Sequence, residues 1–131
     1  MKSESELRRT LVRGLRAHHV MAVSIESGTT GLGIPDVYIR TKRVGAWAEL
    51  KNVKSTIKYP FTISFRPGQY QWLTTHHRLG GTSLLIVGTL FDIFVFKNEH
   101  IKEVYDKTMY KDIDFSFVNF NVAEFIDWLD Q

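Results

Sequence analysis

The sequence predicts an α/β domain in which helices flank a mixed central β-sheet. A leucine stripe at a spacing of four marks a first helix, and two alternating apolar runs mark a β-hairpin. Two later runs of apolar, β-branched residues follow a second helix and are expected to form buried strands. The resulting order of helix, three strands, helix and two strands is typical of a domain with a mixed sheet.

Composition is that of a globular domain. The 131 residues, of which 44% are hydrophobic and 24% charged, suffice for one domain with a proper core. No apolar stretch is long enough to span a membrane, and the N-terminus lacks a signal-peptide pattern. The absence of cysteine excludes disulfides and thiolate zinc sites. We therefore expect a cytoplasmic protein with no membrane partner.

Residues 3–18 are predicted to form the first helix, with Leu7, Leu11 and Leu15 on its inward face. Glu4 falls on that stripe, whereas Glu6 points in roughly the opposite direction, because successive helix residues advance by about 100°. A first strand is expected at Val20–Ile25, followed by a polar, glycine-rich loop at 27–33.

The next two strands are predicted to form a hairpin that turns at Lys42-Arg43. Apolar residues alternate on both sides of that turn: Val37, Ile39, Ala46, Ala48 and Leu50. With the turn centred there, Asp36 lies across from Glu49, since the residue numbers of each opposite pair in an antiparallel hairpin add up to the same value. Lys51 joins the two carboxylates on one face, because side chains in a strand repeat every second residue. Tyr38 and Trp47 share that face, where they either stack on a splayed base or pack beneath a neighbouring loop.

Two carboxylates and a lysine in such a patch suit metal-dependent cleavage of phosphodiesters. Two carboxylates at such a short distance repel each other unless a divalent cation lies between them. Mg²⁺ suits the site because it takes a few carboxylates and keeps water and substrate phosphate as other ligands, and we expect Mn²⁺ to substitute. Lys51 would orient the attacking water or stabilise negative charge on the phosphorane. The alternative is a surface hairpin with ordinary solvated charges.

The remaining elements are predicted from apolar runs and capping residues. Hydrophobic residues show no clear periodicity over residues 52–66, which are expected to form a loop. Pro67 is placed to be the first residue of the second helix, and Gly80-Gly81 to end it. The elements expected beyond it are strands at Thr82–Val87 and Phe91–Phe96, a short helix at 99–107, an extended apolar segment around Phe115–Phe120, and a final helix with a capping box at Asn121 and Glu124.

Basic residues gather in the first half of the chain, whereas the last third is acidic. The net charge of +3 and the sequence pI of about 9.2 permit binding to nucleic acid. The basic residues that we expect to contact DNA lie on the first helix, at the hairpin tip and in the following loop: Arg8, Arg40, Lys42, Arg43, Lys54, Lys58 and Arg66.

The ordered set of motifs resembles the PD-(D/E)XK nuclease superfamily, above all archaeal Holliday junction resolvases, RecU-type resolvases and VRR-NUC nucleases. The motifs are Glu4-Ser5-Glu6-Leu7, Gly33-Ile34-Pro35-Asp36, Glu49-Leu50-Lys51 and Pro67-Gly68-Gln69, in that order. The resemblance covers about residues 3–96. It implies a restriction-endonuclease-like core within a single nuclease domain, 1–131, whose C-terminal extension is about 97–131.

The resemblance also implies a metal-ligand set. Asp36 and Glu49 would bind Mg²⁺, with the Leu50 carbonyl as an additional ligand. Glu4 is the counterpart of the first-helix glutamate of the archaeal resolvases, and would bind a second metal or a water on the first.

Further roles follow from the same resemblance. Lys51 would position the nucleophilic water, and Gln69 would orient that water or the scissile phosphate. The loop Glu26-Ser27-Gly28 resembles the serine-containing active-site loop of those resolvases, which adds Ser27 to the expected DNA contacts.

We therefore expect a Mg²⁺-dependent, structure-selective endonuclease that cuts four-way DNA junctions and leaves 5′-phosphates, in a bacterium or a phage-infected host cell. Two symmetric cuts imply a C2 homodimer, for which Phe115, Phe117 and Phe120 are interface candidates. No small-molecule substrate is expected. The alternatives are a VRR-NUC-type nuclease acting on flaps or general DNA, and a catalytically silent DNA-binding module, against which the intact Asp36, Glu49 and Lys51 argue.

Overall fold

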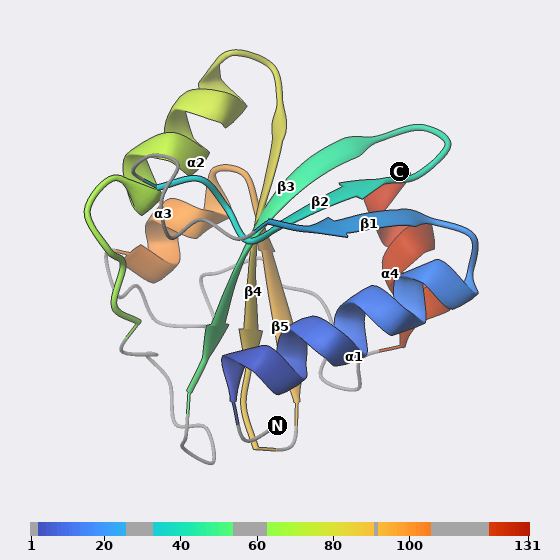
Figure 1. Ribbon diagram of the computed structural model, residues 1–131. Coiled ribbons are helices and arrows are strands. Elements are labelled where there is room, and N and C mark those ends of the chain that lie inside the picture. The colour runs from blue at the N-terminus through green and yellow to red at the C-terminus, as the bar shows by residue number, and fades with distance from the viewer. Residues whose placement is uncertain (1–2, 26–32, 54–62, 91, 106–120) are drawn as a thin grey trace.

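The computed structural model describes residues 3–25, 33–53, 63–90, 92–105 and 121–131 (Figure 1). Within these residues one sheet has the spatial order β1-β2-β3-β4-β5. Neighbouring strands are antiparallel, except that β3 and β4 are parallel, so the predicted mixed sheet is confirmed. The strands are β1 (Met21–Ser24), β2 (Val37–Arg40), β3 (Gly45–Asn52), β4 (Thr82–Gly88) and β5 (Ile93–Lys97).

Helices cover both faces of the sheet. On one face lie α1 (Glu4–Ala17) and α4 (Val122–Leu129), and on the other lie α2 (Gln69–Arg78) and α3 (His100–Tyr105) (Figure 1). The parallel pairing of β3 with β4 needs a crossover connection, which contains α2. Of the described helices, none combines the length and the apolar character needed to cross a membrane.

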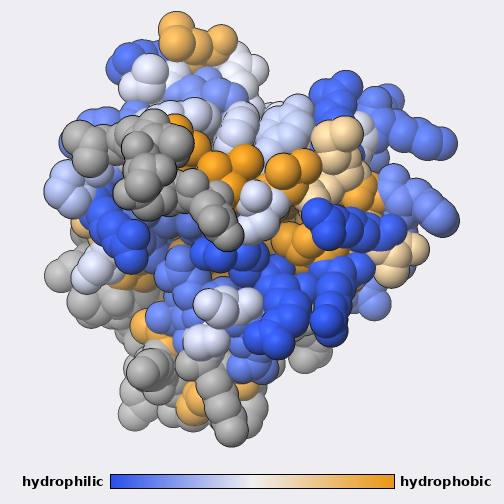
Figure 2. Space-filling view, in the orientation of Figure 1, coloured by the Kyte–Doolittle hydropathy of each residue, from blue (hydrophilic) through white to orange (hydrophobic). Residues whose placement is uncertain are grey.

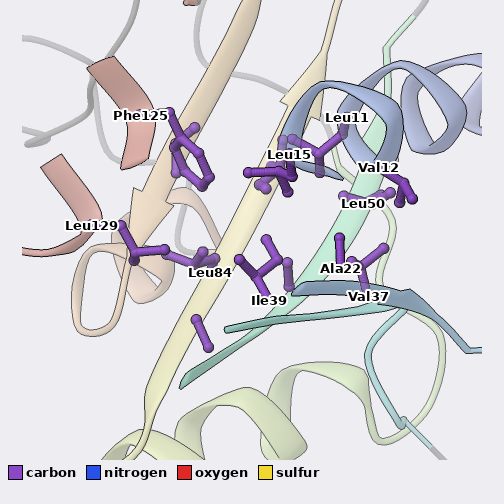
Figure 3. Packing of buried hydrophobic residues seen from close by; sticks show 14 of the residues in the cluster. Leu11, Val12, Leu15, Ala22, Val37, Ile39, Leu50, Leu84, Phe125 and Leu129 are labelled. Atoms are coloured by element: carbon purple, nitrogen blue, oxygen red, sulfur yellow. The ribbon is translucent and has the colours of Figure 1, made fainter. Parts of the chain in front are cut away.

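The larger hydrophobic core lies between the sheet and the pair α1 and α4. Leu11 and Leu15 of α1 point at strand residues such as Ile39 and Leu50, while Phe125 and Leu129 of α4 cover Leu84 (Figure 3). A second core lies on the opposite face, between α2, α3 and the strands β4 and β5, and consists of Leu73, Leu85, Val87, Phe94, Phe96, Ile101 and Val104. The described part of the predicted extension, which carries α3 and α4, therefore packs against both faces of the sheet.

The hairpin has the predicted register. Val37 pairs with Ala48 and Tyr38 pairs with Trp47, and the residue numbers of both pairs add up to the same value. One step beyond this ladder, Asp36 lies opposite Glu49. Because β3 alternates its side chains between the two faces, Glu49 points away from the core under α1, in which Leu50 is fully buried.

The predicted cap at Asn121 is confirmed, and the structure adds a cap at Ser3. The Ser3 side chain accepts a hydrogen bond from the Glu6 amide, and the Asn121 side chain accepts one from the Glu124 amide. The expectation that Pro67 opens the second helix was wrong. Gly68 is the N-cap, in a left-handed conformation with φ of 88°, and the helix begins at Gln69. Only a residue that tolerates positive φ can make this turn without strain.

Several predictions lie outside the described residues. They concern the loop with Ser27, the basic residues Lys54 and Lys58, and the segment with Phe115, Phe117 and Phe120. The predicted strand at Phe91–Phe96 begins at Ile93 in the structure, and the first strand is Met21–Ser24 rather than Val20–Ile25.

Candidate active site

The two predicted metal ligands lie side by side at the end of the β2–β3 hairpin that is away from its turn. Asp36 immediately precedes β2 and Glu49 belongs to β3, and they are 7% and 1% exposed. Asp36 Oδ2 accepts a hydrogen bond of 2.9 Å from the Leu50 amide. Glu49 Oε2 accepts one of 2.9 Å from Gln69 Nε2, but no donor in the described part of the chain reaches the buried Glu49 Oε1. An unsatisfied buried carboxylate oxygen is costly, so this atom is a place for a cation.

Gln69 connects the carboxylates to the predicted lysine. Its Oε1 accepts hydrogen bonds from Lys51 Nζ at 2.9 Å and from the Arg66 amide at 2.7 Å. Lys51 Nζ is also 3.6 Å from Glu49 Oε2. The first turn of α2 thus fixes two side chains of β3, and the side chains of Glu49, Lys51 and Gln69 form one network.

Two glycines bring the separate motifs together. Gly33 has a positive φ of 86°, and a Cβ at this position would be only 2.3 Å from the Gly68 carbonyl oxygen. The segment before Asp36 therefore packs directly on the turn before Gln69. This contact explains in physical terms why both motifs contain a glycine: any side chain at Gly33 would push the two backbones apart.

Arg8 links α1 to the carboxylates. Its Nη2 atom lies 3.8 Å from Glu4 Oε1 and 4.0 Å from Asp36 Oδ1. Glu4 is therefore at the edge of the site and not among the buried pair, and its side chain is 40% exposed. Together with Lys51 and Arg66, Glu4 lines a cavity of about 340 Å³ beside the pair. The sequence predicted Arg8 only as a DNA contact and did not reveal this position, although the i,i+4 spacing from Glu4 was a signal.

In the absence of a cation, the surroundings of Glu49 favour its protonated form. Burial, and then repulsion by Asp36, raises the pKa of Glu49 from 4.5 to about 8, although Lys51 opposes this shift. Burial and then Asp36 also raise the pKa of Glu4, and Lys51 and Arg8 oppose this.

The donors fit a hard divalent cation. Within the described residues, no group of three or more His, Cys, Asp or Glu side chains is close enough to enclose a metal. Mg²⁺ does not require one, because it binds through one or two carboxylates and keeps several waters. The pair of Asp36 and Glu49, with one unsatisfied oxygen and a strong mutual repulsion, meets that requirement.

The hairpin tip lies at the other end of β2 and β3 from the carboxylates. Lys42 and Arg43 are exposed there, and Arg43 Nη1 donates a hydrogen bond of 3.4 Å to the Asp130 carbonyl at the C-terminal end of α4. The Thr41 hydroxyl also contacts the Asp130 side chain. Figure 1 shows the tip beside the C-terminus. Among the predicted DNA contacts, Arg8 and Arg66 are therefore close to the site, whereas Lys42 and Arg43 are remote.

Comparisons with known proteins identify the fold. No family model and no curated protein matches the chain. Among solved structures, the chain is similar to Hjc, a Holliday junction resolvase from the archaeal hyperthermophile Archaeoglobus fulgidus, with a TM-score of 0.55 and 20% sequence identity. The match covers 70% of this chain and 72% of the resolvase. The predicted resemblance is thus confirmed at the level of the fold, and the chain has the restriction-endonuclease-like architecture of that resolvase.

Proposed function

We propose that this protein is a Mg²⁺-dependent endonuclease that hydrolyses phosphodiester bonds in branched DNA, with four-way junctions as its preferred substrate. The observation that carries the proposal is the buried pair of Asp36 and Glu49, which holds an unsatisfied carboxylate oxygen beside a fixed lysine. The fold supports the proposal, because a structural neighbour is described as a Holliday junction resolvase.

The metal would be held by Asp36, Glu49 and the Leu50 carbonyl. The Leu50 amide donates to Asp36, and the amide and carbonyl of one strand residue face the same neighbouring strand, so the carbonyl is expected on the Asp36 side. When bound, Mg²⁺ or Mn²⁺ would polarise the scissile phosphate and lower the pKa of a water.

Lys51 supplies a positive charge at the position where negative charge develops. Its ammonium group is anchored by Gln69 Oε1 and by Glu49, and it lines the cavity beside the pair. A donor held rigidly in this way loses little energy to reorganisation when the phosphorane forms. We assign Lys51 to stabilising that charge and to orienting the attacking water.

Gln69 acts by positioning rather than by contact with the phosphate. Its carbonyl oxygen accepts from Lys51 and from the Arg66 amide, while its amide donates to Glu49. Glu4, at the rim of the same cavity, faces water, and we assign its carboxylate to accept a hydrogen bond from a water that enters there.

The exposed surface of α1, the helix that carries Arg8, suits a polyanion. Strongly hydrophilic side chains gather over α1 in the view of Figure 2, and the exposed residues of this helix include Arg9 and Arg13. Such basic residues supply affinity that does not depend on sequence and that falls with salt. A C2 dimer would place two copies of the site on one junction, as two symmetric cuts require.

Cleavage of a matched set of DNA substrates tests the proposal. Labelled four-way junction, flap and linear duplex of the same sequence are incubated with the protein in Mg²⁺, and in EDTA as the control. We expect cutting that requires Mg²⁺ and is fastest on the junction. Faster cutting of the flap would favour a VRR-NUC-type nuclease, and no cutting of any substrate would contradict the proposed activity.

A further inference from the structure

A row of aromatic side chains leads away from the carboxylate pair along the same face of the sheet. The ring centroids of Tyr38 and Trp47 are 5.1 Å apart, and Trp72 of α2 lies 5.6 Å beyond Trp47, edge to face. His76, one helical turn further, lies 5.1 Å beyond Trp72. We call these four residues the aromatic row.

The strand register places the start of the aromatic row next to the site. Tyr38 is two residues after Asp36, and Trp47 is two residues before Glu49. Side chains two apart on a strand point to the same face and are separated by about 7 Å along it. Tyr38 and Trp47 are therefore the immediate neighbours of the carboxylate pair on the face of β2 and β3 that is turned toward α2.

The other end of the aromatic row opens into a cavity of about 450 Å³. Its described lining consists of Gly68, Gln71, Trp72, Thr75 and His76. It offers the rings of Trp72 and His76, with an amide and a hydroxyl beside them, and none of these lining residues is an acid, a lysine or an arginine. Such a surface suits a flat, uncharged, polar-edged ligand and not a phosphate.

The His76 ring is held in one orientation. Ser83, which is fully buried, donates its hydroxyl to the Leu73 carbonyl at 2.8 Å, so its oxygen accepts from His76 Nδ1 at 3.1 Å. Gly81 leaves the space that the ring occupies, since a Cβ there would lie 2.3 Å from His76 Nε2. Burial, together with His77, lowers the pKa of His76, so the ring is neutral at neutral pH.

We infer that the aromatic row and its cavity bind an unpaired nucleobase of the DNA next to the scissile phosphate. This inference rests on the proposed nuclease function and deepens it by naming the feature of the substrate that is recognised. Aromatic side chains bind bases by stacking on any of them, which contributes roughly a five- to hundredfold gain in affinity per base. A base inside a continuous duplex is already stacked and cannot enter the cavity.

Charge favours nucleic acid over a second copy of the chain as the occupant. The guanidinium of Arg40 and the hydroxyl of Tyr38 both lie over Gly45, where a Cβ would be 3.2 Å from the Arg40 Nη1 atom. Lys51 and Arg66 lie at the other edge, beside the carboxylates. In a C2 dimer built on this face the same surface of both copies would come together, which would bring two sets of these cations into one interface. Phosphates on either side of a bound base would instead be attracted to them.

Tryptophan fluorescence tests the inference without cleavage. The Trp128→Phe variant removes the tryptophan that packs on Phe125 in α4, on the other side of the sheet, and leaves Trp47 and Trp72 as reporters. In EDTA, a junction or flap with an unpaired base should quench this fluorescence, whereas a fully paired linear duplex of the same length should not. The absence of quenching by the unpaired base would overturn the inference.

Affinity measurements on two further variants identify the residue responsible. Trp72→Ala should weaken binding of the DNA with the unpaired base by roughly five- to hundredfold and leave binding of the paired duplex unchanged. Trp72→Phe, which keeps a ring, should retain most of the affinity, and Thr74→Ala, at an exposed position of α2, is the matched control. Equal losses on both DNAs, or a change from dimer to monomer in sedimentation with Trp72→Ala, would overturn the inference in favour of a purely structural role or a contact between copies.

The outcomes separate the inference from the proposed activity. Selective quenching and selective loss by Trp72→Ala in EDTA support base binding even if the wild-type protein cuts no DNA in Mg²⁺. The converse result is that the wild-type protein cuts DNA in Mg²⁺ while Trp72→Ala changes neither DNA affinity. That result would support the nuclease activity and overturn the base-binding role.

Discussion

The two faces of β3 carry side chains of opposite character. Ala48 and Leu50, which face α1, and Glu49 between them, which faces α2, are each no more than 1% exposed. The first face stabilises the fold by excluding water from apolar groups. The second face buries two carboxylates and leaves one oxygen without a donor, which costs stability. Because side chains alternate between the two faces of a strand, β3 stabilises the fold with one face and contributes to the proposed chemistry with the other.

Removal of the ammonium group from the polar face should lower cleavage strongly. Lys51→Met keeps the apolar stem but loses the charge that faces the cavity. We expect single-turnover cleavage to fall by about 10²- to 10³-fold, because one fixed donor to the transition state is lost. Mg²⁺ binding, measured by calorimetry, should persist, and a variant that cuts like the wild type would remove Lys51 from the chemistry.

Variants of Glu4 and Glu6 test how far the polar face extends onto α1. Glu4 lines the site cavity, and burial and the charge of Asp36 raise its pKa. Glu6 lies two residues further along, roughly on the other side of α1. Glu4→Gln should lower single-turnover cleavage by orders of magnitude with little change in stability, and Glu6→Gln should be nearly silent. The reverse ranking would show that Glu4 has no part in the reaction.

A cavity on the apolar face should affect stability alone. Leu84 of β4 is fully buried beneath α4, within the core on the α1 side (Figure 3). Leu84→Ala should lower the free energy of unfolding by about 2–5 kcal/mol, through lost burial and an unfilled cavity. Denaturant titration measures the loss. Cleavage per folded molecule should remain that of the wild type, and a specific loss of cleavage would mean that the two faces are not independent.

The pH dependence of stability should reveal the cost of the buried pair. In the metal-free protein the pKa of Glu49 is about 8, above its ordinary value of 4.5, so between these pH values the folded state holds a proton that the unfolded chain has released. The contribution of this group to stability is therefore complete below pH 4.5 and is lost as the pH rises toward 8.

Glu49→Gln should remove that dependence. At pH 8 the metal-free variant should be more stable than the wild type by on the order of a few kcal/mol, and the difference should close toward pH 5. Thermal and denaturant unfolding in EDTA across this range measure the difference. Parallel pH profiles for the two proteins would contradict a raised pKa of Glu49.

Local patterns were enough to predict the hairpin and the pair. The alternation of apolar residues fixed the register, and a one-residue slip would have placed Leu50 on the polar face. The cap at Asn121 was also predicted from a local pattern, since its side chain bonds to an amide three residues away.

Contacts between distant segments could not be predicted in this way. The bonds from Gln69 to Glu49 and Lys51 depend on Gly33 packing against Gly68, which no spacing in the chain reveals. The wrong start of α2 at Pro67 has the same origin, because the backbone at Gly68 is shaped by that contact. The position of Arg8 beside Asp36 likewise depends on how α1 packs on the sheet.

The most direct test of the central claim is junction cleavage by Asp36→Asn. The substitution keeps the shape of the side chain and removes one charge from the pair, and its amide can still accept the hydrogen bond from the Leu50 amide. We predict a folded protein that binds the junction as well as the wild type or more tightly, since a repulsive charge near phosphate is gone, and that does not cut it in Mg²⁺. Cutting by Asp36→Asn at the wild-type rate would contradict the account.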